Sequence, residues 1–505
     1  MSTIDDILLG LHESLKKLQE LQPEKEAANI KPVVPQKDDN SFTPENLEQI
    51  ADDYINFTYE NPTIYHVVDF FKKELIKNDF TYISESDSWD DVKPGKYFTI
   101  RNGSSLAAFV FGKDWKPEYG IGAIGSHIDS LTTILKPNST KEKVDGYELL
   151  GVAPYAGTLG SLWWDRDLGI GGRLLIKDDK GKIEQKLVDS TPNPIAHIPT
   201  LAPHFGTPAN GPFNTETQAV PVIGFSAEDD DEATENEKKA PLFGKHSIKL
   251  LRFIAKLANV KVENIYQWDL QLYDVQKGVR GGLNKEFVFA PRIDDRVCSY
   301  AALRSLINSA NKNHLKSDSF SIIGLFDNEE VGSLTRQGAK GGLIESVASR
   351  VLSTSYFDHQ EALRLAFANS IILSADVNHL LNPNFKNVYL ENHAPIPNKG
   401  VAIALDPNGH MATDSIGLSL IEQIALKNND KLQYFQIRND SRSGGTIGPS
   451  LSSQTGARCI DLGLPQLSMH SIRAAIGTRD IGLGIKFFEG FFNYWREVYN
   501  DYSDL

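Results

Sequence analysis

Cysteine is scarce in this chain of 505 residues, which contains Cys298 and Cys459 and no others. The two thiols do not have the spacing of a thiolate metal site, and they indicate folding without disulfides in a reducing compartment. Long apolar runs are also missing, since no stretch approaches the roughly 20 residues that span a membrane. The first residues, MSTIDDILLGLHESLKK, lack the apolar block of a secretory signal. We therefore expect no membrane span and no secretory signal.

Positively charged residues are fewer than negatively charged ones. The chain has 52 Lys and Arg against 66 Asp and Glu, a formal net charge of −14. This balance argues against nucleic acid or an anionic membrane as the main partner. No internal repeat and no usual phosphate-binding glycine motif is found. The length favours two domains, or one domain with a large insertion.

Residues 1–45 differ from the rest of the chain. Leucine and isoleucine recur there at alternating steps of four and three, as a short amphipathic helix requires, and Pro23 ends the pattern. Residues 24–45 form a polar linker that contains proline. Two interpretations are open: an ordinary surface helix, or a detachable segment that self-associates or contacts a partner. The periodic residues are Ile4, Leu8, Leu11, Leu15 and Leu18.

The remaining chain divides into three parts that differ in their hydrophobic patterns. Residues 46–135 begin with helical periodicity over 47–78 and continue into apolar strand segments. Residues 136–282 are rich in strand-like segments, with an acidic run at 228–232 that we interpret as a solvated loop. From 283 to 505, short apolar segments alternate with helical patterns, such as those at 295–310 and 415–427. This alternation predicts an α/β fold with a mainly parallel sheet, helices on both faces and an inserted β-rich domain at 136–282.

Histidine and carboxylate residues follow five of the apolar strand segments. A lone histidine at such a place is usually structural, but the same choice at five strand ends predicts a cluster of metal ligands. Imidazole and carboxylate ligands without thiolate suit zinc or another borderline divalent ion. The residues are His127 with Asp129, Asp294 with Asp295, Glu329 with Glu330, Asp376 with His379, and His470.

The segment FDNEEVGS, 326–333, places three carboxylates within four residues. Buried negative charge is costly without a cation. Successive side chains at a strand end point in different directions. One of Glu329 and Glu330 can therefore bind a metal while the other acts on water as a general base. Asp327 is interpreted as a cap of the turn.

The motifs SHIDS, RIDDR, DNEEVGS, SADVNH and MHSIR occur in one order along the chain. In this order and spacing the chain, from about residue 46 to the C-terminus, resembles the aspartyl-aminopeptidase-type dizinc metallopeptidases. Longer segments such as DNEEVGSLTRQGAKGGL and SRSGGTIGPSL look most like a fungal vacuolar branch of that family. The resemblance implies a metalloaminopeptidase with two Zn²⁺ per subunit, acting on peptide substrates.

The resemblance also implies roles for the strand-end residues. Asp294 would bridge the two zincs, and the peptide bond between Asp294 and Asp295 would be cis. Glu329 would be the general base, and Asp129 would orient the imidazole of His127. The terminal zinc ligands would be His127, Glu330, Asp376 and His470.

The inserted domain gains a role from the same resemblance. In the family it makes dimer contacts, dimers assemble into a tetrahedral dodecamer, and one subunit's histidine reaches its neighbour's site. The segment IPTLAPHFG makes His204 the candidate, with a buried packing histidine as the alternative. In RSGGTIGPS, Gly444, Gly445 and Thr446 are expected to line the site, although a plain turn before a helix is the competing interpretation.

Two differences from acid-selective members of the family concern which N-terminal residue is released. Acid-selective members of the family carry a basic residue where this chain has Ala404, and a histidine where it has Asn382. We therefore expect a neutral or apolar N-terminal residue to be released. Alternatives are an acid-selective cytosolic aminopeptidase, a related carboxypeptidase or deacylase, and a non-catalytic self-assembling scaffold.

Residues 1–45 resemble the propeptide of the vacuolar branch. By that resemblance they would cluster the oligomers and bind a selective-autophagy receptor through the N-terminal helix. The segment would be removed in the vacuole, to which the protein would be delivered from the cytoplasm.

Overall fold

The computed structural model describes residues 40–178, 180–226, 232–312, 315–353 and 359–502. The helix expected near the N-terminus and most of the acidic run at 228–232 lie outside these ranges. Within them, no helix combines the length and apolar character that crossing a membrane requires.

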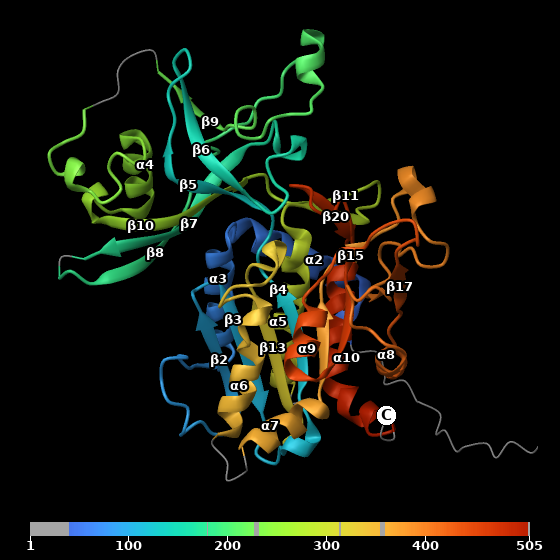
Figure 1. Ribbon diagram of the computed structural model, residues 1–505. Coiled ribbons are helices and arrows are strands. Elements are labelled where there is room, and N and C mark those ends of the chain that lie inside the picture. The colour runs from blue at the N-terminus through green and yellow to red at the C-terminus, as the bar shows by residue number, and fades with distance from the viewer. Residues whose placement is uncertain (1–39, 179, 227–231, 313–314, 354–358, 503–505) are drawn as a thin grey trace, which may run out of the picture. The chain divides into compact units, whose positions relative to one another are not determined.

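The larger sheet has nine strands in the order β1-β2-β3-β13-β4-β14-β18-β16-β17 (Figure 1). Its centre, β13-β4-β14-β18, is entirely parallel, and antiparallel pairs flank it. The α/β class with a mainly parallel sheet is thus confirmed. The strands are β1 (Thr81–Tyr82), β2 (Gly95–Arg101), β3 (Ser105–Phe111), β4 (Gly122–His127), β13 (Phe320–Phe326), β14 (Ile371–Ala375), β16 (Ala402–Leu405), β17 (Gln433–Gln436) and β18 (Arg458–Gly463).

Helices cover both faces of this sheet, because its central strands are buried and apolar on both sides. One apolar cluster joins the sheet to five helices, and a second joins its other face to three. The five are α2 (Pro44–Glu60), α3 (Ile64–Lys77), α5 (Ile293–Asn311), α8 (Ser415–Lys427) and α10 (Asp480–Tyr499). The three are α6 (Leu343–Leu352), α7 (His359–Ala368) and α9 (Gly448–Thr455).

The helix boundaries follow local signals. The helix expected at 415–427 is α8, whose cap Asp414 accepts a hydrogen bond from the N–H of Gly417 at 2.6 Å. The continuous pattern over 47–78 is instead two helices, α2 and α3. The break falls at Asn61–Thr63, where Pro62 cannot continue α2.

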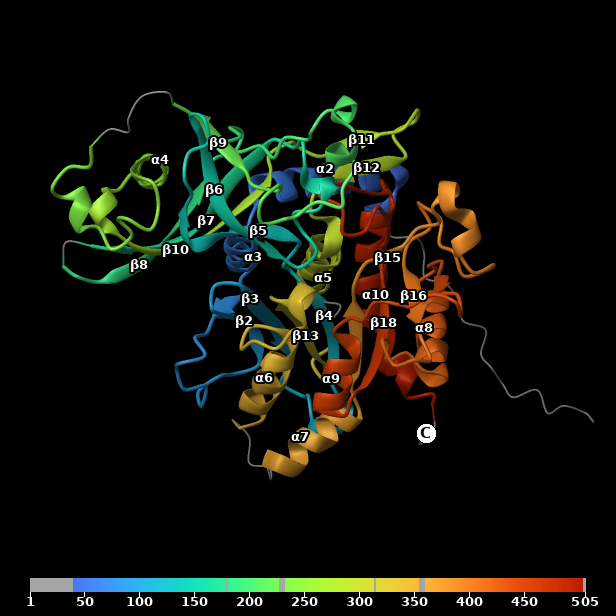
Figure 2. The same ribbon diagram turned by 45° about the horizontal axis from the view of Figure 1, so that its top comes forward.

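A second sheet, of six antiparallel strands in the order β8-β7-β10-β5-β6-β9, is formed mostly by residues 136–282, the region expected to be inserted, although its strand β5 begins at Thr132 (Figure 2). Helix α4 (Ile248–Ala258) packs against it around a separate apolar cluster. The strands are β5 (Thr132–Thr140), β6 (Tyr147–Tyr155), β7 (Leu168–Lys177), β8 (Ile183–Asp189), β9 (Val222–Phe225) and β10 (Ile265–Asp274).

A third sheet of five short strands has the order β11-β12-β20-β19-β15. Two of its strands, β15 and β19, directly follow β14 and β18 of the large sheet, so it fixes the loops that leave those two strands. Its strands are β11 (Val279–Gly281), β12 (Phe287–Ala290), β15 (Asn378–His379), β19 (Pro465–Leu467) and β20 (Ala474–Gly477).

The parallel centre determines where functional side chains meet. Strands β4 and β13 pair in register up to His127 and Phe326, so both end at one edge. At the same edge, Gly463 of β18 lies so close to Asp376 that an added Cβ would be 1.8 Å from the Asp376 carbonyl oxygen. The backbone packing of β18 therefore fixes the position of Asp376.

Candidate metal centre

Asp294 lies where the chain enters α5. Arg292 has a left-handed backbone (φ 59°), Asp294 is extended rather than helical (ψ 116°), and the Asp294–Asp295 peptide bond is cis, as predicted. This entry turns the Asp294 carboxylate away from the helix and toward the carboxyl edge of the large sheet.

His127, Asp294 and Asp376 form the first group of convergent ligand atoms. Nε2 of His127 lies 3.3 Å from Oδ1 of Asp294 and 3.5 Å from Oδ1 of Asp376. Nδ1 of His127 lies 3.0 Å from the carbonyl oxygen of Asp129, which can only accept a hydrogen bond. Nδ1 therefore carries a proton, and Nε2 is the ring atom that faces the two carboxylates and is available to a metal.

Asp294, Glu330 and His470 form the second group. Nε2 of His470 lies 3.7 Å from Oδ2 of Asp294 and 3.9 Å from Oε2 of Glu330. The two carboxylate oxygens of Asp294 thus face different groups. The carboxylates are largely buried, whereas the His470 side chain is 61% exposed. The second group is therefore the one that opens to solvent.

The Asp129 carboxylate contacts residues of both ligand groups. Its Oδ1 accepts a hydrogen bond from the N–H of Glu329 and its Oδ2 accepts one from the N–H of Glu330, each at 3.2 Å. Oδ1 also lies 3.2 Å from Nδ1 of His127. One buried carboxylate therefore fixes the imidazole and the backbone of both glutamates.

Glu329 points toward the first group, with Oε2 at 3.9 Å from Nε2 of His127. Burial raises the pKa of Glu329 to about 8; the nearby His127 lowers it, while Asp376 and Asp294 raise it further. A carboxyl group with this pKa can accept and release a proton near neutral pH.

The electrostatics of the two groups fit a cation. Burial and the negative charge of Asp294 raise the pKa of Glu330 well above its usual value. Its Oε1 is buried and has no hydrogen-bond partner in the described part of the chain. Oxygen and imidazole donors converging without thiolate are the donor set of zinc or a similar divalent ion.

A cavity of about 100 Å³ opens beside both groups. Gly444, Gly445 and Thr446 line it, as the sequence predicted they would line the site, and Oγ1 of Thr446 donates a hydrogen bond to Oδ2 of Asp376 at 2.7 Å. Its remaining wall is partly apolar. Sequence reasoning identified Ala404 there but missed Val377, Met411, Phe435 and Met469.

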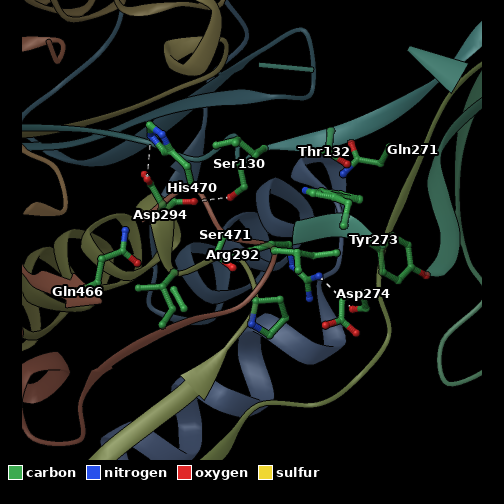
Figure 3. Close-up of a pocket in the computed structure, with 16 residues that line it drawn as sticks. Ser130, Thr132, Gln271, Tyr273, Asp274, Arg292, Asp294, Gln466, His470 and Ser471 are labelled. Atoms are coloured by element: carbon green, nitrogen blue, oxygen red, sulfur yellow. Dashed lines mark hydrogen bonds and ion pairs between the residues drawn. The ribbon is translucent and has the colours of Figure 1, made fainter. Parts of the chain in front are cut away.

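A smaller cavity, of about 30 Å³, borders Asp294 and His470 on the side of the β10 strand (Figure 3). Ser130 also lines it and donates a hydrogen bond to the carbonyl oxygen of Asp294 at 2.6 Å. Since one water needs about 10–15 Å³ by this measure, the smaller cavity has room for about two waters. Of the two cavities that border the metal ligands in the described part of the chain, the larger one has room for a substrate side chain.

His204 is not brought to this centre within the single chain. It lies in a short 3₁₀ helix, Pro203–Phe205, exposed and stacked on Phe205 with 5.3 Å between ring centroids. Tyr155 and Asn328, by contrast, contact the Asp129 network and were missed. Tyr155 lies in the inserted region, and no motif in the sequence connects it to the strand ends.

Comparison with known proteins gives consistent results. Residues 57–492 match the family described as aminopeptidase I zinc metalloprotease (M18). The chain is 59% identical over 470 residues to vacuolar aminopeptidase 1 of Saccharomyces cerevisiae, covering 91% of each chain. It is similar to the crystal structure of prApe1, with a TM-score of 0.88, 58% identity and coverage of 90% of this chain and 97% of the other. It is also similar to the structure of the S. cerevisiae mApe1 dodecamer, with a TM-score of 0.83 and 55% identity, covering 91% of this chain and 100% of the other.

Removal of divalent ions tests the electrostatics of the centre. In the ion-free folded protein the pKa of Glu329 is about 8 and that of Glu330 is raised, against 4.5 for an ordinary glutamate. The folded state then binds more protons than the unfolded state between about pH 4.5 and 8, so the free energy of unfolding falls as pH rises through this window.

We expect the Tm of chelator-treated protein, measured by calorimetry, to decrease from pH 5 to pH 8. Adding back zinc should make this decrease smaller, because a cation compensates the ionised carboxylates of Glu329 and Glu330. A Tm of the chelated protein that is constant across this window would contradict the assignment of buried charge.

Proposed function

Because the chain belongs to the aminopeptidase I zinc metalloprotease (M18) family and is a zinc-dependent aminopeptidase, we propose that it binds two zinc ions per subunit and releases neutral or apolar N-terminal residues from peptides. The observation that carries the two-ion proposal is the geometry of Asp294. Its two oxygens face two separate ligand groups, as a bridging carboxylate requires.

The two groups divide the proposed ligands. His127, Asp294 and Asp376 would hold one ion, and Asp294, Glu330 and His470 would hold the other. The unpartnered Oε1 of Glu330 supports its assignment as a ligand. Asp129 lies behind these residues and would orient His127 without binding the metal.

Zinc supplies Lewis acidity at such a site, polarising a carbonyl oxygen and making water more acidic. Glu329 is the group of this chain that would move the proton. Its carboxylate lies beside the first ligand group, and its backbone is fixed by Asp129. Glu329 would take a proton from the attacking water and pass it to the amine that leaves.

The shape of the centre supports an exopeptidase. The largely buried carboxylates of Glu329, Glu330 and Asp376 line the cavity and can bind the positively charged α-amino group of a substrate. The first side chain would then lie against the apolar wall formed by Met411 and Phe435. Ala404 on this wall offers no charge to an acidic substrate.

We also propose that the chain assembles as a dodecamer of tetrahedral symmetry. The support is its similarity to the solved mApe1 dodecamer. In this assembly His204 of one subunit would reach the site of its neighbour. His204 is exposed in the single chain and does not line the described cavity beside the metal ligands, which is what a role in a neighbouring site requires.

The proposed location is the vacuole, from similarity to the vacuolar relative. Residues 1–45 would act as a propeptide. Their periodic helix would bind a selective-autophagy receptor in the cytoplasm, and the segment would be removed after delivery. This proposal depends on the sequence pattern of the segment, because residues 1–39 lie outside the described structure.

Glu329→Gln tests the proton transfer. The amide keeps the shape of the side chain but cannot act as a base, so we expect kcat for a leucyl peptide to fall about 10²–10⁴-fold with zinc content unchanged. Glu330→Gln is the matched control and should lose zinc from the site. Activity of Glu329→Gln within tenfold of wild type would refute this role.

A panel of aminoacyl substrates tests the specificity. With defined zinc, kcat/KM for leucyl and methionyl substrates should exceed that for aspartyl and glutamyl substrates, because the cavity wall at Ala404, Met411 and Phe435 offers no positive charge. A clear preference for an acidic residue would overturn this interpretation. Cleavage confined to N-blocked substrates would favour a deacylase.

Mixed oligomers test the assignment of His204. His204→Ala and Glu329→Gln should each be nearly inactive alone, with the same particle mass as wild type by light scattering. After dissociation and joint reassembly, some sites combine an intact Glu329 with the intact His204 of a neighbour, so activity should return. If His204 serves its own subunit, no activity will return.

A further inference from the structure

Strand β6 of the six-stranded sheet ends beside the metal centre. Its last residue, Tyr155, donates a hydrogen bond from its hydroxyl to Oδ2 of Asp129 at 2.7 Å. This is the shortest of the polar contacts that the Asp129 carboxylate makes, the others being 3.2 Å. A side chain of the inserted region is thus a principal partner of the carboxylate that supports both ligand groups.

The Tyr155 hydroxyl also accepts a hydrogen bond, from Nδ2 of Asn328 at 2.8 Å. Asn328 has a left-handed backbone (φ 60°) and directly precedes Glu329. Its Oδ1 accepts hydrogen bonds from Thr335 at 2.7 Å and Gln337 at 3.1 Å. Tyr155 therefore connects Asp129 to the loop that presents the two glutamates.

A polar cavity of about 230 Å³ lies on the side of Asp129 away from the metal ligands. Tyr155, Asn328 and Asp129 form part of its wall, together with charged residues such as Arg173. Without the Tyr155 hydroxyl, Oδ2 of Asp129 would lose its closest donor and face a space large enough for water. The hydroxyl thus supplies the shortest of the hydrogen bonds that orient the carboxylate.

We propose that Tyr155 is a positioning residue of the metal centre. It acts through Asp129, fixing the carboxylate so that the His127 ring and the backbones of Glu329 and Glu330 stay in the geometry that binds zinc. The six-stranded sheet is then a structural part of the site as well as a neighbouring unit. This inference rests on the proposed function, which supplies the roles of the supported residues.

Tyr155→Phe removes the hydroxyl and keeps the ring. Because substitutions of outer partners of metal ligands typically cost 10–100-fold in metal affinity or activity, we expect zinc affinity, measured by competition with a chelator, to fall about tenfold or more. The kcat for a leucyl peptide should fall similarly, while KM stays within twofold, since Tyr155 does not line the substrate cavity.

Tyr147→Phe is the matched control. It removes a hydroxyl from the other end of β6, where Tyr147 is 51% exposed and packs on Phe225, and it should leave zinc affinity and kcat unchanged. Zinc affinity and kcat of Tyr155→Phe within twofold of wild type would overturn the proposal.

Asn328→Gly gives an independent test, including the case in which Tyr155→Phe does not fold. Glycine accepts the left-handed backbone and removes the donor to Tyr155. Its zinc affinity should fall, and combining it with Tyr155→Phe should cost less than the two losses added. Unchanged affinity, or full additivity, would overturn the proposal. Failure of the wild-type protein to bind zinc or cleave peptides would instead refute the proposed function.

Discussion

The metal centre depends on negative charge that is concentrated at one buried edge of the large sheet. Asp294, Asp376, Glu329 and Glu330 each lie within 3.9 Å of the ring nitrogen of His127 or His470, and burial opposes the ionisation of such groups. The raised pKa values of the glutamates express this cost in the absence of an ion. A bound cation removes it, so the same feature that destabilises the empty centre provides affinity for zinc.

The fold makes this concentration possible through two kinds of support. The parallel strands β4 and β13 bring their ends to one edge, and close backbone packing of Gly463 places Asp376 there. The second kind is polar and centres on Asp129, which binds backbone N–H groups as well as the His127 ring. Backbone packing fixes where the residues are, and hydrogen bonds fix how they are turned.

Sequence reasoning could predict much of this arrangement. Repetition of histidine and carboxylate residues after apolar strands indicated which side chains meet, because parallel strands share a carboxyl edge. It could not assign Glu330 to the group of His470, since that depends on how the loop after β13 turns through Asn328. Tyr155 was also beyond reach, because a tyrosine at the end of an inserted strand has no spacing that relates it to Asp129. The break between α2 and α3 at Asn61–Thr63 was also missed, because the helical periodicity over 47–78 continues across it.

The position of Asp294 between the two ligand groups has a thermodynamic consequence for binding of the two proposed zinc ions. One oxygen of Asp294 faces each ligand group, so if two ions bind as proposed, the first would fix the carboxylate that the second needs. The first ion would also add positive charge near the second position, which opposes binding there. By linkage, the two affinities would change each other by the same factor. Titration with zinc would then give a coupled pair of macroscopic constants, and neither constant would belong to one group of ligands alone.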